Sequence, residues 1–253
     1  MKKETTPQTV IEIKNLQKNF GNLKVLNDIS LHLNKQENLV VLGKSGTGKS
    51  VLIKCIARLL KADSGTITIL GQEVNNLKSN ELNEIRKKIG FLFQSGALYD
   101  SMTVKENLEF PLRRIKKDLS DAEIDKKVQE TLENVGLKDV LNKMPSELSG
   151  GMRKRISLAR TIIIDPEIML YDEPTTGLDP VTAREISELI NDIQKKYKTA
   201  SIIITHDMEC VRIVADRIIM LKEGDVYKEG TLKEFENSKD EFINAFFQTK
   251  KQN

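Results

Sequence analysis

One loop sets the topology of this chain, and it reads Gly43-Lys44-Ser45-Gly46-Thr47-Gly48-Lys49-Ser50. The apolar run at residues 39–42 precedes the loop and a helical pattern at residues 51–60 follows it, so a strand, a glycine-rich turn and a helix are expected in succession. Glycines let successive backbone N–H groups point into one concavity, and the start of a helix adds further free N–H groups. The pattern therefore predicts a cradle for the phosphates of a nucleoside triphosphate, with Lys49 on the terminal phosphates and Ser50 on Mg²⁺.

The composition is that of a globular domain with a sizeable core. The 253 residues are 39% hydrophobic and 30% charged, and the net charge of +3 is too small to indicate nucleic acid. Two cysteines far apart in the sequence argue against a disulfide scaffold or a zinc site. No apolar run is long enough to cross a bilayer, so any contact with a membrane is expected to depend on a partner.

Three later apolar runs resemble buried parallel strands, and each ends in a polar group. In an open parallel sheet, the carboxyl ends of the strands meet at the edge where ligands bind. The sequence therefore predicts that these polar groups and the glycine loop form one site. The runs with their final polar residues are residues 91–93 with Gln94, residues 168–171 with Asp172 and Glu173, and residues 202–204 with His206.

Charge assigns a role to each of these groups. Mg²⁺ on a triphosphate prefers hard oxygen ligands, which Asp172 and the amide of Gln94 supply beside Ser50. Glu173 is the candidate to orient or deprotonate the attacking water, and His206 can donate a hydrogen bond to the γ-phosphate. Each residue alone also has a structural interpretation, since an Asp-Glu-Pro sequence suits a turn and a single histidine is usually structural.

The segment before the loop has a β pattern, and the segment after residue 94 has a helical one. Between residues 9 and 33, alternation places His32 on the polar face of a half-buried strand. Phe20 is either a core aromatic or a ring on which a purine base stacks, and spacing alone leaves both open. Residues 95–159 read as a helical insert, in which Ser120 and Glu123 form a capping box.

A second glycine-containing segment opens a helix near the end of this insert. Its first turn carries Arg153, Lys154 and Arg155, although cations at a helix N-terminus oppose the helix dipole. The cluster is explained if the Ser149 hydroxyl and the glycine N–H groups receive an anion, and a solvated basic turn is the alternative. The segment reads Leu148-Ser149-Gly150-Gly151-Met152.

Together these residues resemble the ATPase subunit of ABC transporters along essentially the whole chain. The resemblance implies an α/β P-loop NTPase fold with a RecA-like core, an N-terminal antiparallel β subdomain and an inserted helical subdomain. It implies a single domain over residues 1–253, with the core and β subdomain at 1–94 and 160–253 and the helical subdomain at 95–159. The matching motifs are residues 43–50 as Walker A, Gln94 as the Q-loop, residues 148–152 as the signature, residues 168–173 as Walker B, Gly177-Leu178-Asp179 as the D-loop and His206 as the switch histidine.

The resemblance also implies the ligands and how they are held. ATP and Mg²⁺ are the expected cofactors, with Phe20 stacked on adenine and Val25, residues 43–50 and Val51 around the nucleotide. Lys49, Glu173 and His206 are the expected catalytic residues, and Ser50, Gln94 and Asp172 the Mg²⁺ ligands. The resemblance further implies a head-to-tail dimer, in which the signature and Asp179 of one subunit contact the ATP bound to the other subunit.

A narrower resemblance is to the Mla/Mce-type ATPases, which serve phospholipid transport between bacterial membranes. It rests on residues 93–104, on Phe110-Pro111-Leu112, and on Met152 where most signatures have glutamine. It implies a transmembrane permease, an MCE substrate-binding protein and a small STAS-domain protein as partners. It also implies attachment to the cytoplasmic face of the inner membrane through the permease, with no nucleic acid bound.

Other functions and the C-terminal segment stay open at this point. An ATPase of an amino-acid or metal importer is one alternative. A soluble ABC ATPase acting on DNA or ribosomes is another. It predicts a long coiled-coil insert, a tandem second cassette or a strong basic patch, whereas only about a hundred residues without sustained heptads separate Lys49 from Leu148. The phenylalanine-rich residues 241–247 either pack on the domain or dock a partner.

Overall fold

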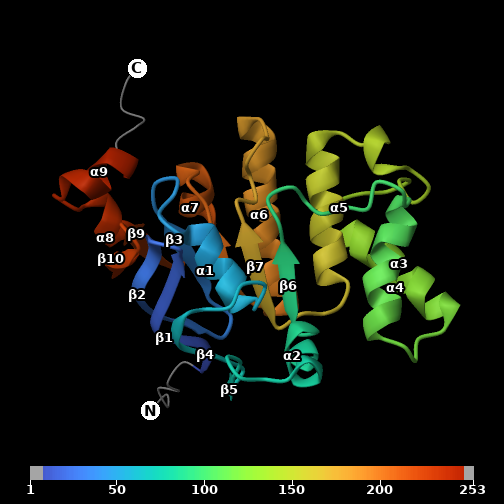
Figure 1. The fold of residues 1–253 in the computed structure, drawn as a ribbon. Helices are drawn as coiled ribbons and strands as arrows, with labels where there is room; N and C mark the ends of the chain where they lie inside the picture. Colours follow the sequence, from blue (N-terminus) through green and yellow to red (C-terminus); the bar gives the residue numbers. More distant parts are fainter. Residues whose placement is uncertain (1–7, 248–253) are drawn as a thin grey trace, which may run out of the picture.

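A single sheet forms the centre of the computed structural model, which describes residues 8–247 (Figure 1). Its strands are β1 (Thr9–Phe20), β2 (Leu23–Asn34), β3 (Asn38–Leu42), β4 (Ser64–Ile69), β5 (Gln72–Glu73), β6 (Ile89–Leu92), β7 (Ile168–Asp172), β8 (Ala200–Ile204), β9 (Arg217–Lys222) and β10 (Asp225–Gly230). The helices are α1 (Lys49–Ile56), α2 (Ser79–Arg86), α3 (Val104–Ile115), α4 (Asp121–Asn134), the 3₁₀ helix η1 (Pro145–Glu147), α5 (Gly150–Ile162), α6 (Pro180–Tyr197), α7 (Met208–Val214), α8 (Leu232–Glu236) and α9 (Glu241–Phe247).

The core half of the sheet is parallel, as the buried apolar runs predict. The ten strands lie in the order β5-β4-β1-β2-β10-β9-β3-β8-β7-β6, and β9, β3, β8, β7 and β6 pair in parallel. Every residue of β3, β7 and β8 is buried, which is typical of strands covered on both faces. Parallel pairing brings the carboxyl ends of these strands to one edge, where the predicted site residues follow them.

The N-terminal half is an antiparallel layer built on the long β1–β2 hairpin. β1 pairs antiparallel with both β2 and β4. Leu31 and Leu33 of β2 are buried whereas His32 is exposed, so the predicted orientation of this strand is confirmed. β9 and β10 form a second hairpin, since they pair antiparallel around a turn at Gly224.

The segment after β6 forms a helical lobe beside the sheet (Figure 1). Ser120 caps α4 in the predicted capping box with Glu123, and the α4 stripe that includes Ile124 and Val128 is buried. The helical pattern, expected to end near residue 159, continues to Ile162. The reason is that α5 leaves the lobe and packs against β6, so one helix joins the lobe to the sheet.

The phenylalanine-rich C-terminal segment packs on its own domain. The Phe242 ring lies 5.3 Å from the ring of Tyr227 in β10, and the Phe247 ring lies 5.9 Å from that of Phe235 in α8. These contacts place α9 beside β10 and α8, near the end of the molecule that carries the glycine loop (Figure 1). Within residues 8–247, the structure therefore supports the packing interpretation of residues 241–247.

Neither cysteine forms a disulfide, and both are packed in the interior. Burial raises the pKa of Cys55 to about 11 and that of Cys210 to about 12, so both thiols are protonated at neutral pH. No helix in the described part of the chain has the length and apolar character needed to cross a membrane.

Candidate functional site: a nucleotide cradle at the carboxyl edge of the sheet

The loop between β3 and α1 requires its glycines. Gly46 and Gly48 have φ values of 82° and 93°, in the left-handed region that side chains disfavour. A Cβ on Gly43 would lie 2.6 Å from Oγ1 of Thr47 and 2.8 Å from the carbonyl oxygen of Leu221. Gly48 is also the N-cap of α1 and contributes no side-chain acceptor, so the first N–H groups of this helix are available to an anion.

Lys49 lies inside this loop. Its side chain is nearly covered, with 7% of the residue exposed, and Nζ donates to the carbonyl oxygens of Gly43 at 2.7 Å and Lys44 at 3.0 Å. Burial lowers the pKa of Lys49, and the negative charges of Glu173 and Asp172 act in the opposite direction. The ammonium is therefore held against the loop carbonyls and close to two carboxylates.

Ser50 and Asp172 form the oxygen pair predicted for Mg²⁺. The Ser50 hydroxyl donates to Oδ1 of Asp172 at 3.0 Å. Burial raises the pKa of Asp172, and the Ser50 hydrogen bond opposes this shift. A hydroxyl and a carboxylate in contact suit Mg²⁺ when phosphate oxygens and water complete the shell. Among residues 8–247, no group of three or more His, Cys, Asp or Glu side chains is arranged to hold a metal ion.

Glu173 and His206 meet across two neighbouring strands. A hydrogen bond of 2.8 Å joins Nδ1 of His206, after β8, to Oε2 of Glu173, after β7. The backbone N–H of Glu173 donates to the carbonyl oxygen of Ile204, and its φ of 51° is unusual for a residue with a side chain. The Glu173 side chain is 13% exposed and that of His206 65%, so the carboxylate is sheltered behind an accessible imidazole.

A single cavity of about 560 Å³ brings most of the predicted nucleotide residues together. Asp172 lies behind this lining, bonded to Ser50, whereas Thr47 and Phe20 do not line the cavity. Phe20 is 47% exposed at the tip of the β1–β2 hairpin, so it is not a core aromatic, and its stacking on adenine stays a prediction. The cavity is lined by Val25, Gly43, Lys44, Ser45, Gly46, Gly48, Lys49, Ser50, Val51, Gln94, Glu173, His206 and Phe246.

Phe246 is the lining residue that sequence reasoning misses. It reaches the cavity from α9, and the neighbouring Phe242 ring lies 5.4 Å from Nζ of Lys44 in the glycine loop. The helical spacing of the phenylalanines predicts an apolar face but not what that face covers. The position of α9 depends on its packing against β10 and α8, for which the sequence carries no local signal.

The signature residues lie outside this cavity. The Ser149 hydroxyl caps α5 by accepting a hydrogen bond from the backbone N–H of Met152 at 3.2 Å. The Met152 side chain is partly buried and packs against the apolar core. Asp179 of the D-loop caps α6, accepting from the N–H groups of Val181 at 3.1 Å and Thr182 at 3.0 Å. Roles of Ser149 and Asp179 at a second subunit's ATP stay predictions.

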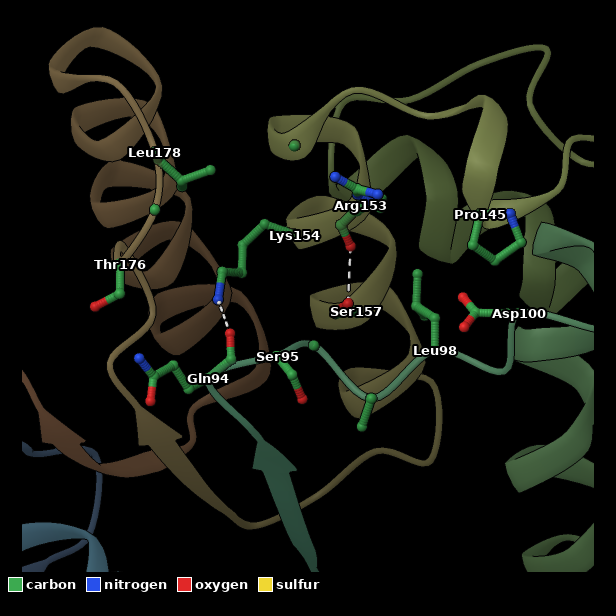
Figure 2. Close-up of a pocket in the computed structure, with 14 residues that line it drawn as sticks. Gln94, Ser95, Leu98, Asp100, Pro145, Arg153, Lys154, Ser157, Thr176 and Leu178 are labelled. Carbon is green, nitrogen blue, oxygen red and sulfur yellow. Dashed lines mark hydrogen bonds between the residues drawn. The ribbon is translucent and has the colours of Figure 1, made fainter.

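Two of the three cations in the first turns of α5 form hydrogen bonds within the domain. Lys154 is 6% exposed and its Nζ donates to the carbonyl oxygen of Gln94 at 3.0 Å, as Figure 2 shows. Arg155 donates to the carbonyl oxygen of Val135 and to Glu185, both at 2.9 Å. Arg153 is left beside a second cavity of about 450 Å³ between the Q-loop, α5 and the D-loop. Lys154 and Arg155 are therefore held by contacts within the domain, and an anion at Ser149 and the glycine N–H groups stays a prediction.

A glycine loop, buried lysine and carboxylate of this kind at the edge of a parallel sheet define a P-loop nucleoside triphosphatase. Comparison with known proteins gives the family. A family model described as ABC transporter matches residues 26–176, and the chain belongs to that family.

Curated relatives match most of the chain. The probable ribonucleotide transport ATP-binding protein mkl of Mycobacterium leprae is 44% identical over 211 residues, covering 83% of this chain and 60% of the relative. The methionine import ATP-binding protein MetN of Brucella abortus is 38% identical over 229 residues, covering 90% of this chain and 62% of the relative. This chain thus spans about three fifths of the length of these two relatives. TRIGALACTOSYLDIACYLGLYCEROL 3, a chloroplastic protein of Arabidopsis thaliana, is 38% identical over 260 residues, covering 96% of this chain and 74% of the relative.

Solved structures confirm the predicted fold. The dimeric structure of MJ0796, a bacterial ABC transporter cassette, has a TM-score of 0.81 at 34% identity, covering 88% of this chain and 98% of that one. The cbiO1 protein of Clostridium perfringens, part of the cbiONQ transporter complex, has a TM-score of 0.82 at 29% identity and covers 90% of each chain. The α/β P-loop fold of an ABC cassette is therefore established for this chain.

Proposed function

We propose that this chain is the ATP-hydrolysing motor subunit of a membrane ABC transporter. The observation that carries this proposal is the convergence of Lys49, Gln94, Glu173 and His206 on one cavity, with Ser50 bonded to Asp172 beside it. These residues come from segments far apart in the sequence and have the charges that a triphosphate and its metal require.

Each group has one task in the proposed reaction. The loop N–H groups and Lys49 bind the phosphates, and Mg²⁺, held by Ser50, Asp172 and Gln94, would neutralise their charge. Glu173 accepts the proton of the attacking water, since its carboxylate is sheltered and next to the phosphate loop. His206 donates from Nδ1 to Glu173, and we assign its Nε2 to the γ-phosphate, to which it donates when both ring nitrogens carry a proton.

The site is completed by a second copy. The signature residues 148–152 do not line the phosphate cavity of their own subunit. In a head-to-tail dimer, Ser149 and the glycine N–H groups at the start of α5 would cover the γ-phosphate held by the partner, with Asp179 close by. The dimeric state of the similar MJ0796 cassette supports this arrangement.

For the substrate, we propose phospholipid, in a transporter of the Mla/Mce type. The sequence at residues 93–104 and the packed Met152 support this choice, and one relative carries the name of a galactolipid. The partners would be a permease, an MCE protein and a STAS-domain protein, with the chain on the cytoplasmic face of the inner membrane. Relatives named for methionine import and ribonucleotide transport support the alternative of a small-molecule transporter.

Purification from membranes tests this proposal. The tagged chain, expressed in cells that contain its native partners, is expected to isolate a transmembrane permease. Phospholipid measured by mass spectrometry should exceed that of an unrelated permease purified in the same detergent. A periplasmic solute-binding protein without excess lipid would contradict the phospholipid substrate, and isolation with ribosomes or DNA would contradict the transporter role itself.

A further inference from the structure

A buried lysine on the signature helix holds the backbone of the Q-loop. Lys154 lies in the first turns of α5, and its Nζ donates to the carbonyl oxygen of Gln94 at 3.0 Å (Figure 2). Gln94 follows β6, so this bond joins the signature helix to the segment that leaves the sheet. The side chain of the same Gln94 lines the phosphate cavity. Gln94 therefore directs its side chain into the phosphate cavity, and its backbone carbonyl accepts the hydrogen bond from Lys154.

A second contact lies one turn further along α5. A Cβ on Gly96 would lie 2.5 Å from Oγ of Ser157, so the loop backbone rests directly on the helix. The Ser157 hydroxyl in turn donates to the carbonyl oxygen of Arg153 at 2.8 Å, which fixes its orientation (Figure 2). Lys154 and Ser157 are three residues apart and share one face of α5. Residues 94–96 thus lie against one face of α5, where Lys154 forms a hydrogen bond to Gln94 and Ser157 packs closely against Gly96.

Packing alone does not explain a lysine at position 154. Burying an ammonium group is costly, and an apolar side chain of similar length fills the same space without that cost. The other buried side chains of this helix include Ile156 and Leu158, so an apolar residue would suit the surroundings. An apolar residue would lack the hydrogen bond to the Q-loop, and also the positive charge that interacts with Asp172.

We propose that Lys154 is a positioning residue that fixes residues 94–96 against α5. It thereby determines the position of the Gln94 side-chain amide in the phosphate cavity. Because the signature begins the same helix, the bond makes the signature and the Gln94 amide move as one unit. The inference rests on the proposed function, in which Gln94 is a ligand of Mg²⁺ on ATP.

The dependence of activity on Mg²⁺ tests this role. In the full chain, Lys154→Met should raise the Mg²⁺ concentration for half-maximal ATP turnover by about fivefold and lower kcat by about tenfold, within the range that misplacement of a catalytic group costs. The Kd for ATP without Mg²⁺ should stay within about twofold, because the loop and Lys49 are untouched. Lys154→Arg should restore part of the activity, since the adjoining cavity has room for the longer donor. Lys126→Met on the exposed face of α4 is the matched control.

A double-mutant cycle shows whether Lys154 acts through Gln94. If it does, Lys154→Met should add less than twofold to the defect of Gln94→Ala, because the positioned side chain is already absent. Additive defects would overturn the proposal, as would normal turnover and Mg²⁺ dependence in Lys154→Met.

Thermal unfolding separates positioning from folding. Lys154→Met removes the cost of a buried charge but leaves the Gln94 carbonyl without its donor, so its Tm should stay within a few degrees of that of the unaltered chain. A loss of activity that follows a lower Tm would assign a structural role instead and overturn the inference. The proposed function fails on a different result, namely unchanged ATP binding in Lys49→Ala, so the two failures are distinguishable.

Discussion

Replacing Glu173 with glutamine is expected to lower ATP turnover by about a hundredfold or more while ATP stays bound. Glutamine matches glutamate in size and can keep the hydrogen bond to His206, so the fold and the cradle should persist. It cannot accept the proton of the attacking water. With hydrolysis blocked, the ATP-bound dimer has no route to reopen and should accumulate.

The loss of hydrolysis is measured as ATP turnover at saturating Mg·ATP. The accumulation of the dimer is measured as the molar mass of the protein by light scattering. Glu84→Gln, on the exposed surface of α2, is the matched control and should behave like the unaltered chain. Near-normal turnover in Glu173→Gln would remove Glu173 as the base.

Replacing Lys49 with alanine should remove measurable affinity for ATP, with Kd rising about a hundredfold or more. The ammonium is enclosed by the loop and supplies the one full positive charge buried there. Charge-assisted hydrogen bonds to phosphate are among the strong ones, and water entering the vacated space would not replace that charge.

Equilibrium binding of a fluorescent ATP analogue measures this loss. Lys61→Ala, on an exposed residue beyond α1, is the control for removing a lysine. The substitution also removes the hydrogen bonds from Lys49 to the carbonyl oxygens of the loop, which could destabilise the fold. Circular dichroism should therefore accompany the assay to show that the variant is folded. Unchanged affinity in the folded variant would refute the cradle.

The sequence predicts those parts of the site that follow from strand periodicity. Buried runs at β3, β7 and β8 are continuous because both faces of the sheet are covered, and parallel strands bring their ends to one edge. This is why the loop, Glu173 and His206 were expected together and lie together. Alternation of apolar and polar residues likewise predicts the exposed position of His32 in β2.

The features of the site that strand periodicity does not predict depend on contacts between segments far apart in the sequence. The sequence shows the cations of α5 but not their partners, and the structure shows that Lys154 bonds to Gln94 and Arg155 to Glu185. Lys154 lies on the buried face of α5 with Thr161, seven residues on, and that spacing was the available signal. For Phe246 no such signal exists, because α9 reaches the phosphate cavity only through tertiary packing.

Cross-linking between subunits tests the central claim, that ATP is held by the cradle of one copy and the signature of another. Both native cysteines are buried, so single cysteines introduced as Ser45→Cys in one chain and Ser149→Cys in a second are the reactive pair. We expect a short thiol cross-linker to join the two chains when Mg·ATP is present in the Glu173→Gln background, and not in its absence. A cross-link that forms within one chain carrying both substitutions, or none with ATP, would contradict the account.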